Sequence, residues 1–238
     1  MSLSNTSTHT PPRPAPQQRT RIKMCGFTRE ADVLAACAAG ADAIGFVLYP
    51  PSPRSVSIAR AAGLARLLPA FVTPVLLFVN ETAERIQAAC AAVPGALLQF
   101  HGDESADFCA AMTQLTGRPH LKAARIPLSE VHDFDLLEFA TQHHKAQALL
   151  LDAHVDGYGG GGKTFHWSLL PPNVNAHLVL SGGLTPANVG DGIRALRSCG
   201  LSLAIDVSSG IEEGKGLKDA QKIQQFAAAV RAADADPL

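Results

Sequence analysis

Residues 149–164 read LLLDAHVDGYGGGGKT and contain the structural unit that is repeated along the chain. Leu149 to Leu151 form a short apolar run, which is typical of a strand buried on both faces. Asp152 ends this run, and a carboxylate at the end of a buried strand is costly unless it is hydrogen-bonded or functional. The glycines that follow predict a flexible loop. We therefore expect a rigid strand that presents an acid beneath a loop able to close over it.

The same stretch also matches a phosphate-binding pattern. Residues 157–164 fit G-x-x-x-x-G-K-T, the loop of many nucleotide-hydrolysing enzymes. Such a loop opens a full helix, whose N-terminus receives the phosphates. Here Pro171 and Pro172 stop any helix after a few residues. The context therefore disfavours a nucleotide hydrolase.

Outward from this unit, short apolar runs recur, and each is followed by a turn and a segment with helical spacing. The runs predict eight strands, at 22–25, 43–48, 74–79, 97–99, 120–124, 149–152, 177–180 and 202–207. Helices are expected at 28–39, 58–68, 82–92, 104–115, 129–144, from Thr185 and Pro186 onward, and at 218–233. Eight such units predict a single (β/α)8 TIM barrel, and a doubly wound open sheet is the alternative.

The composition agrees with one folded domain. Of the 238 residues, 47% are hydrophobic and 17% are charged, which is sufficient for a substantial core. Residues 1–20 are rich in Ser, Thr, Pro and Gln, so we expect a disordered tail ahead of a barrel at 21–238. The net charge of −1, without a dense basic cluster, disfavours nucleic acid as a partner. No apolar run approaches the ~18–20 residues that span a bilayer, so no membrane association is expected.

The cysteines indicate a reducing compartment. There are five, an odd number, and they form no C-x-x-C pair: Cys25, Cys37, Cys90, Cys109 and Cys199. No signal peptide pattern precedes them, so we expect free thiols in a cytoplasmic protein. No three His, Cys or carboxylate residues have the spacing of metal ligands, so no metal is expected.

In a barrel, functional residues lie at the C-terminal ends of the strands. Cys25 is followed at once by Gly26, so its thiol can reach the barrel mouth, although a lone cysteine is more often a small buried hydrophobe. His101 is either a substrate contact or a polar group at the start of a helix. The same criterion selects Arg54, Gln99, Asp152 and Asp206. By contrast, His143 and His144 are expected on a solvent-facing helix, without a function.

Two glycine turns follow the last two strands. Gly182 and Gly183 come after the seventh strand, and Ser208, Ser209 and Gly210 come after the eighth. Barrels often bind phosphate with these two loops, through backbone N–H groups and a helix N-terminus. Glycines also simply make turns, but the joint position of these two turns favours a phosphate site.

Eight segments, in order, resemble phosphoribosylanthranilate isomerases over Arg21 to about Phe226: KMCGFT, GADAIGFVLYPPSPRSVS, LLFVN, LQFHGDE, LKAARI, LLLDAHVDGYGGGGKTFHW, LSGGLTPANV and AIDVSSGIEEGKGLKD. The resemblance implies a step of tryptophan biosynthesis, the Amadori rearrangement of N-(5-phosphoribosyl)anthranilate to 1-(2-carboxyphenylamino)-1-deoxyribulose 5-phosphate, without a cofactor. It implies Cys25 as the general base, Asp152 as the general acid and Arg54 as the contact for the anthranilate carboxylate.

A free thiol titrates near ~8.5, so Cys25 needs either a depressed pKa or catalysis through a minor ionised fraction, and in both cases an accessible thiol.

Two other barrel enzymes and one non-catalytic barrel are the alternatives to an isomerase. An indole-glycerol-phosphate synthase uses lysine and glutamate at strand ends, and a pentose-phosphate epimerase uses a metal and paired aspartates, so Cys25 and Asp152 disfavour both. A non-catalytic phosphosugar-binding barrel is disfavoured because both an acid and a base are present. A side activity on aminoimidazole-carboxamide ribotide, and the choice between monomer and homodimer, stay open.

Overall fold

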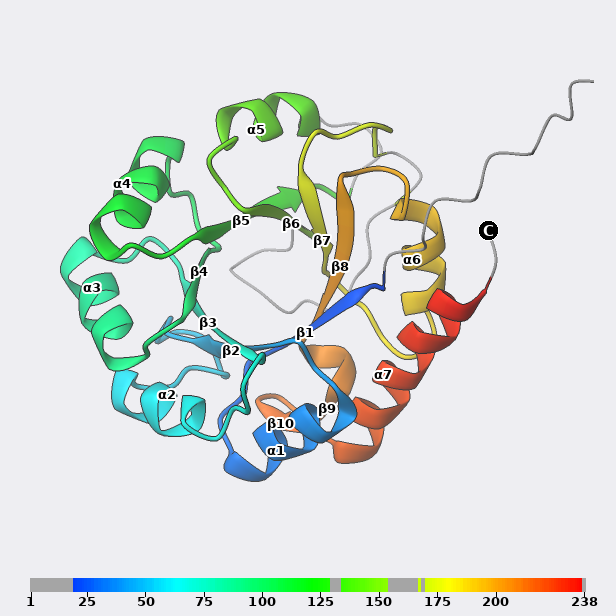
Figure 1. The fold of residues 1–238 in the computed structure, drawn as a ribbon, viewed down its shortest axis with the longest axis horizontal. Helices are drawn as coiled ribbons and strands as arrows, with labels where there is room; N and C mark the ends of the chain where they lie inside the picture. Colours follow the sequence, from blue (N-terminus) through cyan, green and yellow to red (C-terminus); the bar gives the residue numbers. More distant parts are fainter. Residues whose placement is uncertain (1–18, 129–133, 154–166, 168–169, 237–238) are drawn as a thin grey trace, which may run out of the picture.

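The structure of the chain is a computed structural model, which describes residues 19–128, 134–153, 167 and 170–236. Its barrel strands are β1 (Arg21–Cys25), β2 (Ala43–Val47), β3 (Thr73–Phe78), β4 (Leu97–Phe100), β5 (His120–Ile126), β6 (Ala148–Ala153), β7 (His177–Leu180) and β8 (Ser202–Val207). Its α-helices are α1 (Glu30–Ala39), α2 (Ile58–Ala65), α3 (Ala83–Ala92), α4 (Ala106–Thr116), α5 (Leu136–Gln142), α6 (Val189–Leu196) and α7 (Ala220–Ala235). The helices form a ring around the strands (Figure 1).

The eight strands close into one parallel barrel in sequence order, which confirms the predicted TIM barrel. β1 completes the closure because it pairs with β2 on one side and with β8 on the other. Lys23 lies opposite Asp206 in the β1–β8 pair, and Cys25 lies opposite Gly45 in the β1–β2 pair. The first and last strands therefore bring residues from the two ends of the chain into one wall.

Alternation along the strands divides the core into an inner and an outer part. The lower layer inside the barrel holds small and branched side chains, Leu121, Ala123, Ala148, Leu150 and Val179. The layer nearer the catalytic end contains Cys25, Val47, Leu77 and Val79. The remaining buried apolar side chains form the larger core, which joins the strands to the helices. The functional groups described below therefore stand on a filled barrel interior.

Side-chain caps set the start of several helices. The Oγ atoms of Ser57, Thr82 and Ser105 accept hydrogen bonds from backbone N–H groups in the first turns of α2, α3 and α4. Each cap satisfies a donor that the helix itself leaves unpaired. Asp135 and Asp219 do the same for α5 and α7. The first three caps explain why α2, α3 and α4 start close to the predicted positions.

Two predicted helix starts are wrong. α6 begins at Val189 and not at Thr185, because Asn188 Oδ1 accepts from the Thr185 N–H at 2.8 Å and holds a turn ahead of the helix. α7 begins at Ala220, because Lys218 belongs to an unpredicted hairpin of β9 (Glu212–Gly214) and β10 (Leu217–Lys218). A short 3-10 turn, η2 (Ser209–Ile211), precedes this hairpin.

A third predicted helix is longer than the one observed. α5 covers Leu136–Gln142, whereas the sequence predicts a helix over 129–144. Phe134 and Asp135 lie before the helix and residues 129–133 lie outside the described residues. Asp135 accepts from the Leu137 and Glu138 N–H groups, so the helix starts at its cap.

The described part of the chain begins at Arg19, two residues before the predicted start of the barrel domain. Thr20 is buried, and its N–H and Oγ1 donate to the two carboxylate oxygens of Asp234 at 2.9 and 2.7 Å. Arg19 forms an ion pair with Asp42. Arg19 and Thr20 thus contact the barrel, residues 1–18 lie outside the described residues, and the tail boundary at residue 20 stays a prediction. In the part of the chain that is described, no helix has the length and apolar character to cross a bilayer.

Candidate active site

Cys25 ends β1 inside the barrel mouth and is only 4% exposed. Gly45 on the neighbouring strand provides the space for its thiol, since a Cβ atom at position 45 would lie 2.5 Å from Cys25 Sγ. The thiol therefore occupies a site that would be too narrow with any other residue at position 45. The expected accessible thiol is wrong for this structure, in which Cys25 is buried.

Lys23 lies two residues before Cys25, on the same face of β1, and forms a buried ion pair with Asp206. Their Nζ and Oδ1 atoms lie 2.8 Å apart, and both side chains are almost fully buried. Burial tends to lower the pKa of Lys23, but the charges of Asp206 and of the Cys25 thiolate outweigh it, so the pKa is raised. Lys23 is therefore a positive charge fixed beneath the thiol.

The pKa of Cys25 is raised above its usual value, chiefly because burial disfavours the thiolate. Lys23 and Lys218 lower it, and Asp206 raises it further. Of the two alternatives drawn from the sequence, a depressed pKa is therefore wrong. This direction agrees with the other alternative, in which only a minor fraction of the thiol is ionised at neutral pH.

Arg54 lies in the loop after β2 and is already held by a carboxylate. Its Nε donates to Glu212 Oε1 at 2.7 Å and its Nη2 to Glu212 Oε2 at 2.8 Å, in a buried pair. Lys218 Nζ donates to the same Oε1 at 2.8 Å. Burial would raise the pKa of Glu212, but these two cations lower it, so the carboxylate is ionised. Arg54, which is predicted to contact the substrate carboxylate, is thus held at its Nε–Nη2 edge by Glu212.

Asp152 is the next-to-last residue of β6 and is hydrogen-bonded to His101. Its Oδ2 lies 2.9 Å from His101 Nε2, and His101 Nδ1 lies 3.0 Å from Gln99 Nε2. With Gln99 donating to Nδ1, the imidazole proton is on Nε2 and points to Asp152. All three side chains are buried, and Gln99 Oε1 has no hydrogen-bond partner among the described residues. Three predicted site residues thus form one hydrogen-bonded chain.

The two glycine turns lie against each other at the same mouth. Gly182 and Gly183 both have positive φ angles, 80° and 63°, which favour glycine. A Cβ atom at Gly210 would overlap the backbone of Leu184, so the turn after β8 packs directly on the turn after β7. A Cβ atom at Gly182 would lie 3.1 Å from Asp152 Oδ1. The structure therefore brings these turns together beside Asp152, although α6 starts several residues later than expected.

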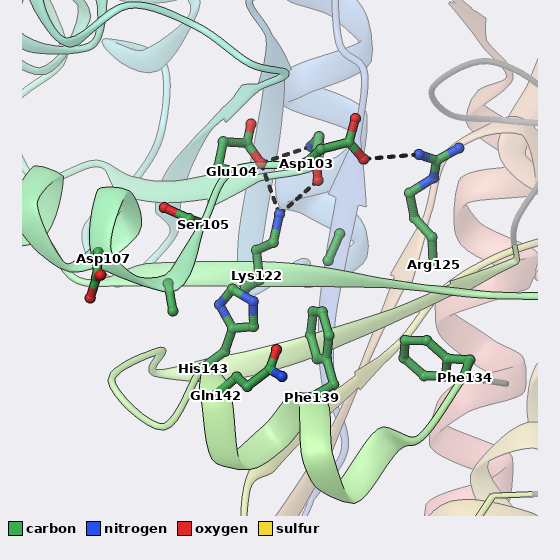
Figure 2. Close-up of a pocket in the computed structure, with 13 residues that line it drawn as sticks. Asp103, Glu104, Ser105, Asp107, Lys122, Arg125, Phe134, Phe139, Gln142 and His143 are labelled. Carbon is green, nitrogen blue, oxygen red and sulfur yellow. Dashed lines mark hydrogen bonds and ion pairs between the residues drawn. The ribbon is translucent and has the colours of Figure 1, made fainter.

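A separate pocket lies outside the barrel, between the loop after β4 and helix α5 (Figure 2). Its volume is about 570 Å³, and it contains none of the predicted site residues. A buried ion pair between Lys122 Nζ and Glu104 Oε2, 2.8 Å apart, stands at its centre. Glu104 also accepts from the Asn80 and Gly102 N–H groups, so this carboxylate joins the loop after β3 to the loop after β4 and to Lys122 of β5.

His143 lines this outer pocket and is not on a solvent-facing surface, contrary to prediction. It is 8% exposed, and its ring lies 4.4 Å from the ring of Phe139. Burial lowers the pKa of His143 to about 4. His144 is exposed, as predicted.

Three residues of the site were missed by the sequence analysis: Lys23, Glu212 and Lys218. Each lies in one of the segments that carry the family resemblance. A single lysine or glutamate, in a strand or in a turn, does not by itself indicate a functional site. Among the described residues, no three His, Cys, Asp or Glu side chains are grouped so that they could hold a metal ion.

Comparisons with known proteins point to one family. The family model described as N-(5'phosphoribosyl)anthranilate (PRA) isomerase matches residues 22–229. The N-(5'-phosphoribosyl)anthranilate isomerase of Methylibium petroleiphilum is 59% identical over 91% of this chain and 96% of its own length. That of Leptothrix cholodnii is 58% identical, over 91% and 93%.

Solved structures give the same result. Phosphoribosyl anthranilate isomerase from Thermotoga maritima has a TM-score of 0.78 and 38% identity, covering 90% of this chain and 99% of its own. A structure of the enzyme in complex with reduced 1-(o-carboxyphenylamino)-1-deoxyribulose 5-phosphate has a TM-score of 0.73 and 34% identity, with the same coverage. Fold, order of segments and identity all agree, and this chain belongs to the phosphoribosylanthranilate isomerase family.

Proposed function

We propose that this isomerase carries out its Amadori rearrangement by acid–base catalysis, with Asp152 as the general acid and Cys25 as the general base. The substrate is N-(5-phosphoribosyl)anthranilate and the product is 1-(2-carboxyphenylamino)-1-deoxyribulose 5-phosphate. The observation that carries the proposal is the placement of both side chains at the ends of strands of one barrel mouth. Each has buried polar neighbours that can hold a charge change during turnover.

Ring opening is the first step. Protonated Asp152 gives its proton to the furanose ring oxygen, the bond from C1 to that oxygen breaks, and the anthranilate nitrogen supplies the electron pair that forms an iminium ion. The acid is left as a carboxylate. The Nε2–H of His101, 2.9 Å from Asp152 Oδ2, stabilises this carboxylate by a hydrogen bond. His101 is therefore proposed as a positioning residue for the acid.

Proton abstraction is the second step. The thiolate of Cys25 takes the proton from the sugar C2, and the electron pair of that bond moves to the iminium, which gives an enolamine. Transfer of the C2 hydroxyl proton and reprotonation at C1 convert the enolamine to the ketone, so the overall change is an isomerisation. Lys23, paired with Asp206 beneath Cys25, favours the thiolate and opposes part of the larger effect of burial.

The remaining residues hold the substrate at its two ends. The packed turns that contain Gly182, Gly183 and residues 208–210 offer backbone N–H groups to the phosphate, beside Asp152. Arg54, whose other edge is held by Glu212, offers its free edge to the anthranilate carboxylate. Inorganic phosphate should therefore compete with the substrate.

The test follows the loss of anthranilate fluorescence with freshly made substrate, with and without a chelator. Wild-type protein should turn over, and the chelator should have no effect. Asp152→Asn keeps the shape but cannot donate the proton, so turnover should fall at least ~10²-fold. Binding of the reduced product analogue should change far less, which separates chemistry from binding. Lack of activity in the wild type would overturn the function, and normal turnover of Asp152→Asn would remove Asp152 from the mechanism.

A further inference from the structure

Arg54 has donors to spare after it binds Glu212. A guanidinium carries five N–H groups, and Glu212 takes the Nε proton and one Nη2 proton. The two Nη1 protons and the second Nη2 proton form a second edge, and no hydrogen-bond partner for Nη1 is found in the described part of the chain. This edge matches a second carboxylate in the same bidentate geometry.

Lys218 is bound in a way that fits an ammonium ion. Its side chain is fully buried, and its Nζ has three acceptors, Glu212 Oε1 at 2.8 Å, Ser208 O at 3.0 Å and Ser208 Oγ at 3.3 Å. Three acceptors match the three protons of an ammonium group. Burial lowers the pKa of Lys218, and the contact with Glu212 opposes that effect. A buried lysine is costly, so its presence here calls for a reason.

The net charge of the cluster formed by Arg54, Glu212 and Lys218 gives a reason for this buried lysine. Arg54 and Lys218 contribute two positive charges and Glu212 one negative charge, so the cluster keeps a net charge of +1. Without Lys218, the pair of Arg54 and Glu212 would be neutral and would attract an incoming carboxylate only weakly. With Lys218, binding of one carboxylate brings the buried cluster to neutrality, which is the favourable state in a low dielectric.

The cluster is also connected to Cys25. Ser208, which Lys218 contacts twice, donates its Oγ–H to the backbone oxygen of Cys25 at 3.0 Å. The charge of Lys218 lowers the pKa of the thiol against the effect of burial. The other charged groups that act on this thiol are Lys23 and Asp206, which form a pair of their own.

We propose that Lys218 is a positioning residue that gives the Arg54–Glu212 pair its excess positive charge and thereby makes Arg54 a receptor for the substrate carboxylate, while it ties this receptor to the strand of the base through Ser208. This inference rests on the proposed function, because it names how that site recognises the carboxylate of its substrate. It makes carboxylate recognition and thiolate formation depend on one lysine.

The decisive variant is Lys218→Met, which keeps the length of the side chain and removes the charge. We expect the KM to rise ~10-fold or more, since one member of a buried charged cluster is removed. The thiolate of Cys25, followed by its ultraviolet absorbance relative to Cys25→Ser, should form at higher pH than in the wild type. Lys215→Met is the matched control, because Lys215 is exposed in the same hairpin, and it should leave both values unchanged.

A double variant tests the charge count directly. Glu212→Gln combined with Lys218→Met restores a net charge of +1 on Arg54 alone, so its KM should lie below that of Lys218→Met. Its thiolate should still form at higher pH than in the wild type. If Lys218→Met does not fold, as judged by circular dichroism, the thiolate titration of the double variant decides the proposal alone.

The outcomes separate this inference from the proposed function. Affinity for the reduced product analogue, measured by calorimetry, should fall in Lys218→Met, and absence of binding to the wild type would instead overturn the proposed function. If the wild type binds the analogue, but Lys218→Met keeps the wild-type KM and thiolate titration, the role of Lys218 is overturned. A lower melting temperature without a change in KM or in the titration would equally overturn it, since that is the result of a purely structural contact.

Discussion

The two halves of the barrel mouth, one around Cys25 and one around Asp152, surround a buried group that is proposed to transfer a proton. The two groups have different kinds of neighbours. Around Cys25, the neighbours are charged: the pair of Lys23 and Asp206 lies below it, and Lys218 acts on it from the hairpin after β8. Around Asp152, the hydrogen-bonded neighbours are an imidazole and an amide, His101 and then Gln99, joined by hydrogen bonds of 2.9 and 3.0 Å. Both environments are buried, so the difference does not come from solvent.

The chemistry of the two groups explains this difference. A buried thiol must be helped to ionise, because burial raises its pKa, and fixed positive charges provide that help. The proposed acid must instead change its charge in every cycle, and a hydrogen-bond donor such as the His101 imidazole can stabilise its carboxylate without a permanent counter-charge. The comparison teaches that the base half is tuned by charge and the acid half by orientation.

The largest effect is expected for Cys25→Ser. Serine keeps the shape, but a hydroxyl ionises far less readily than a thiol, so turnover should fall by ~10²- to ~10⁴-fold. Gly45 still leaves room for the smaller side chain, so the melting temperature should stay close to the wild-type value. Steady-state kinetics measures the loss, and Cys37→Ser, in α1, serves as the control. Turnover within tenfold of the wild type would place the base elsewhere.

A smaller effect is expected for Asp206→Asn, which removes the partner of Lys23. Breaking one side of a buried ion pair costs about 3 kcal/mol, which urea denaturation would measure. Asp206 also raises the pKa of Cys25, so the thiolate should form at lower pH in this variant, opposite in sign to Lys218→Met. Asp191→Asn, in an exposed ion pair on α6, is the control for stability. A thiolate titration that moves to higher pH would refute the charge-tuned description of the base half.

The smallest effect is expected outside both halves, at His143. Its pKa is lowered to about 4 by burial, so the unfolded chain binds a proton that the folded chain does not. Stability from this group is complete above its unfolded pKa of ~6.5 and is lost as the pH falls toward about 4. As the pH is lowered from ~6.5 to about 4, the melting temperature of His143→Leu should therefore decrease less than that of the wild type. His144→Leu, at an exposed position, should keep the wild-type pH dependence.

Sequence reasoning was sufficient for the barrel because the apolar runs are local. Each strand has its own buried pattern, such as Leu149 to Leu151, and each turn ends it with glycine, proline or a polar residue. The predicted helix starts were wrong where a side chain outside the periodic apolar pattern determines the first residue of the helix. Asn188 closes a turn ahead of α6, and Lys218 is drawn into a strand by its pairing with Glu212.

For the site, position at a strand end predicts Cys25 and Asp152 as candidate residues, but it does not predict the charged and polar groups around them. Glu212 and Lys218 lie in a short stretch of charged residues and glycines, which resembles a solvated turn. Arg54 and Glu212 are separated by 158 residues in the chain and meet only when the barrel closes. The direction of the Cys25 pKa could not be predicted for the same reason, because it depends on burial and on Lys218.

The pairing of β1 with β8 has a consequence for the chain while it is being made. The ribosome releases β1 first, but the strand that supplies Asp206 appears only near the end of synthesis. Until then the nascent chain has an open sheet edge at β1, with unpaired backbone groups and a lysine that lacks its counter-charge. A ribosome that stalls before β8 therefore leaves a protein without a closed wall or a formed active site. That unfinished chain is a substrate for chaperones and is prone to aggregate.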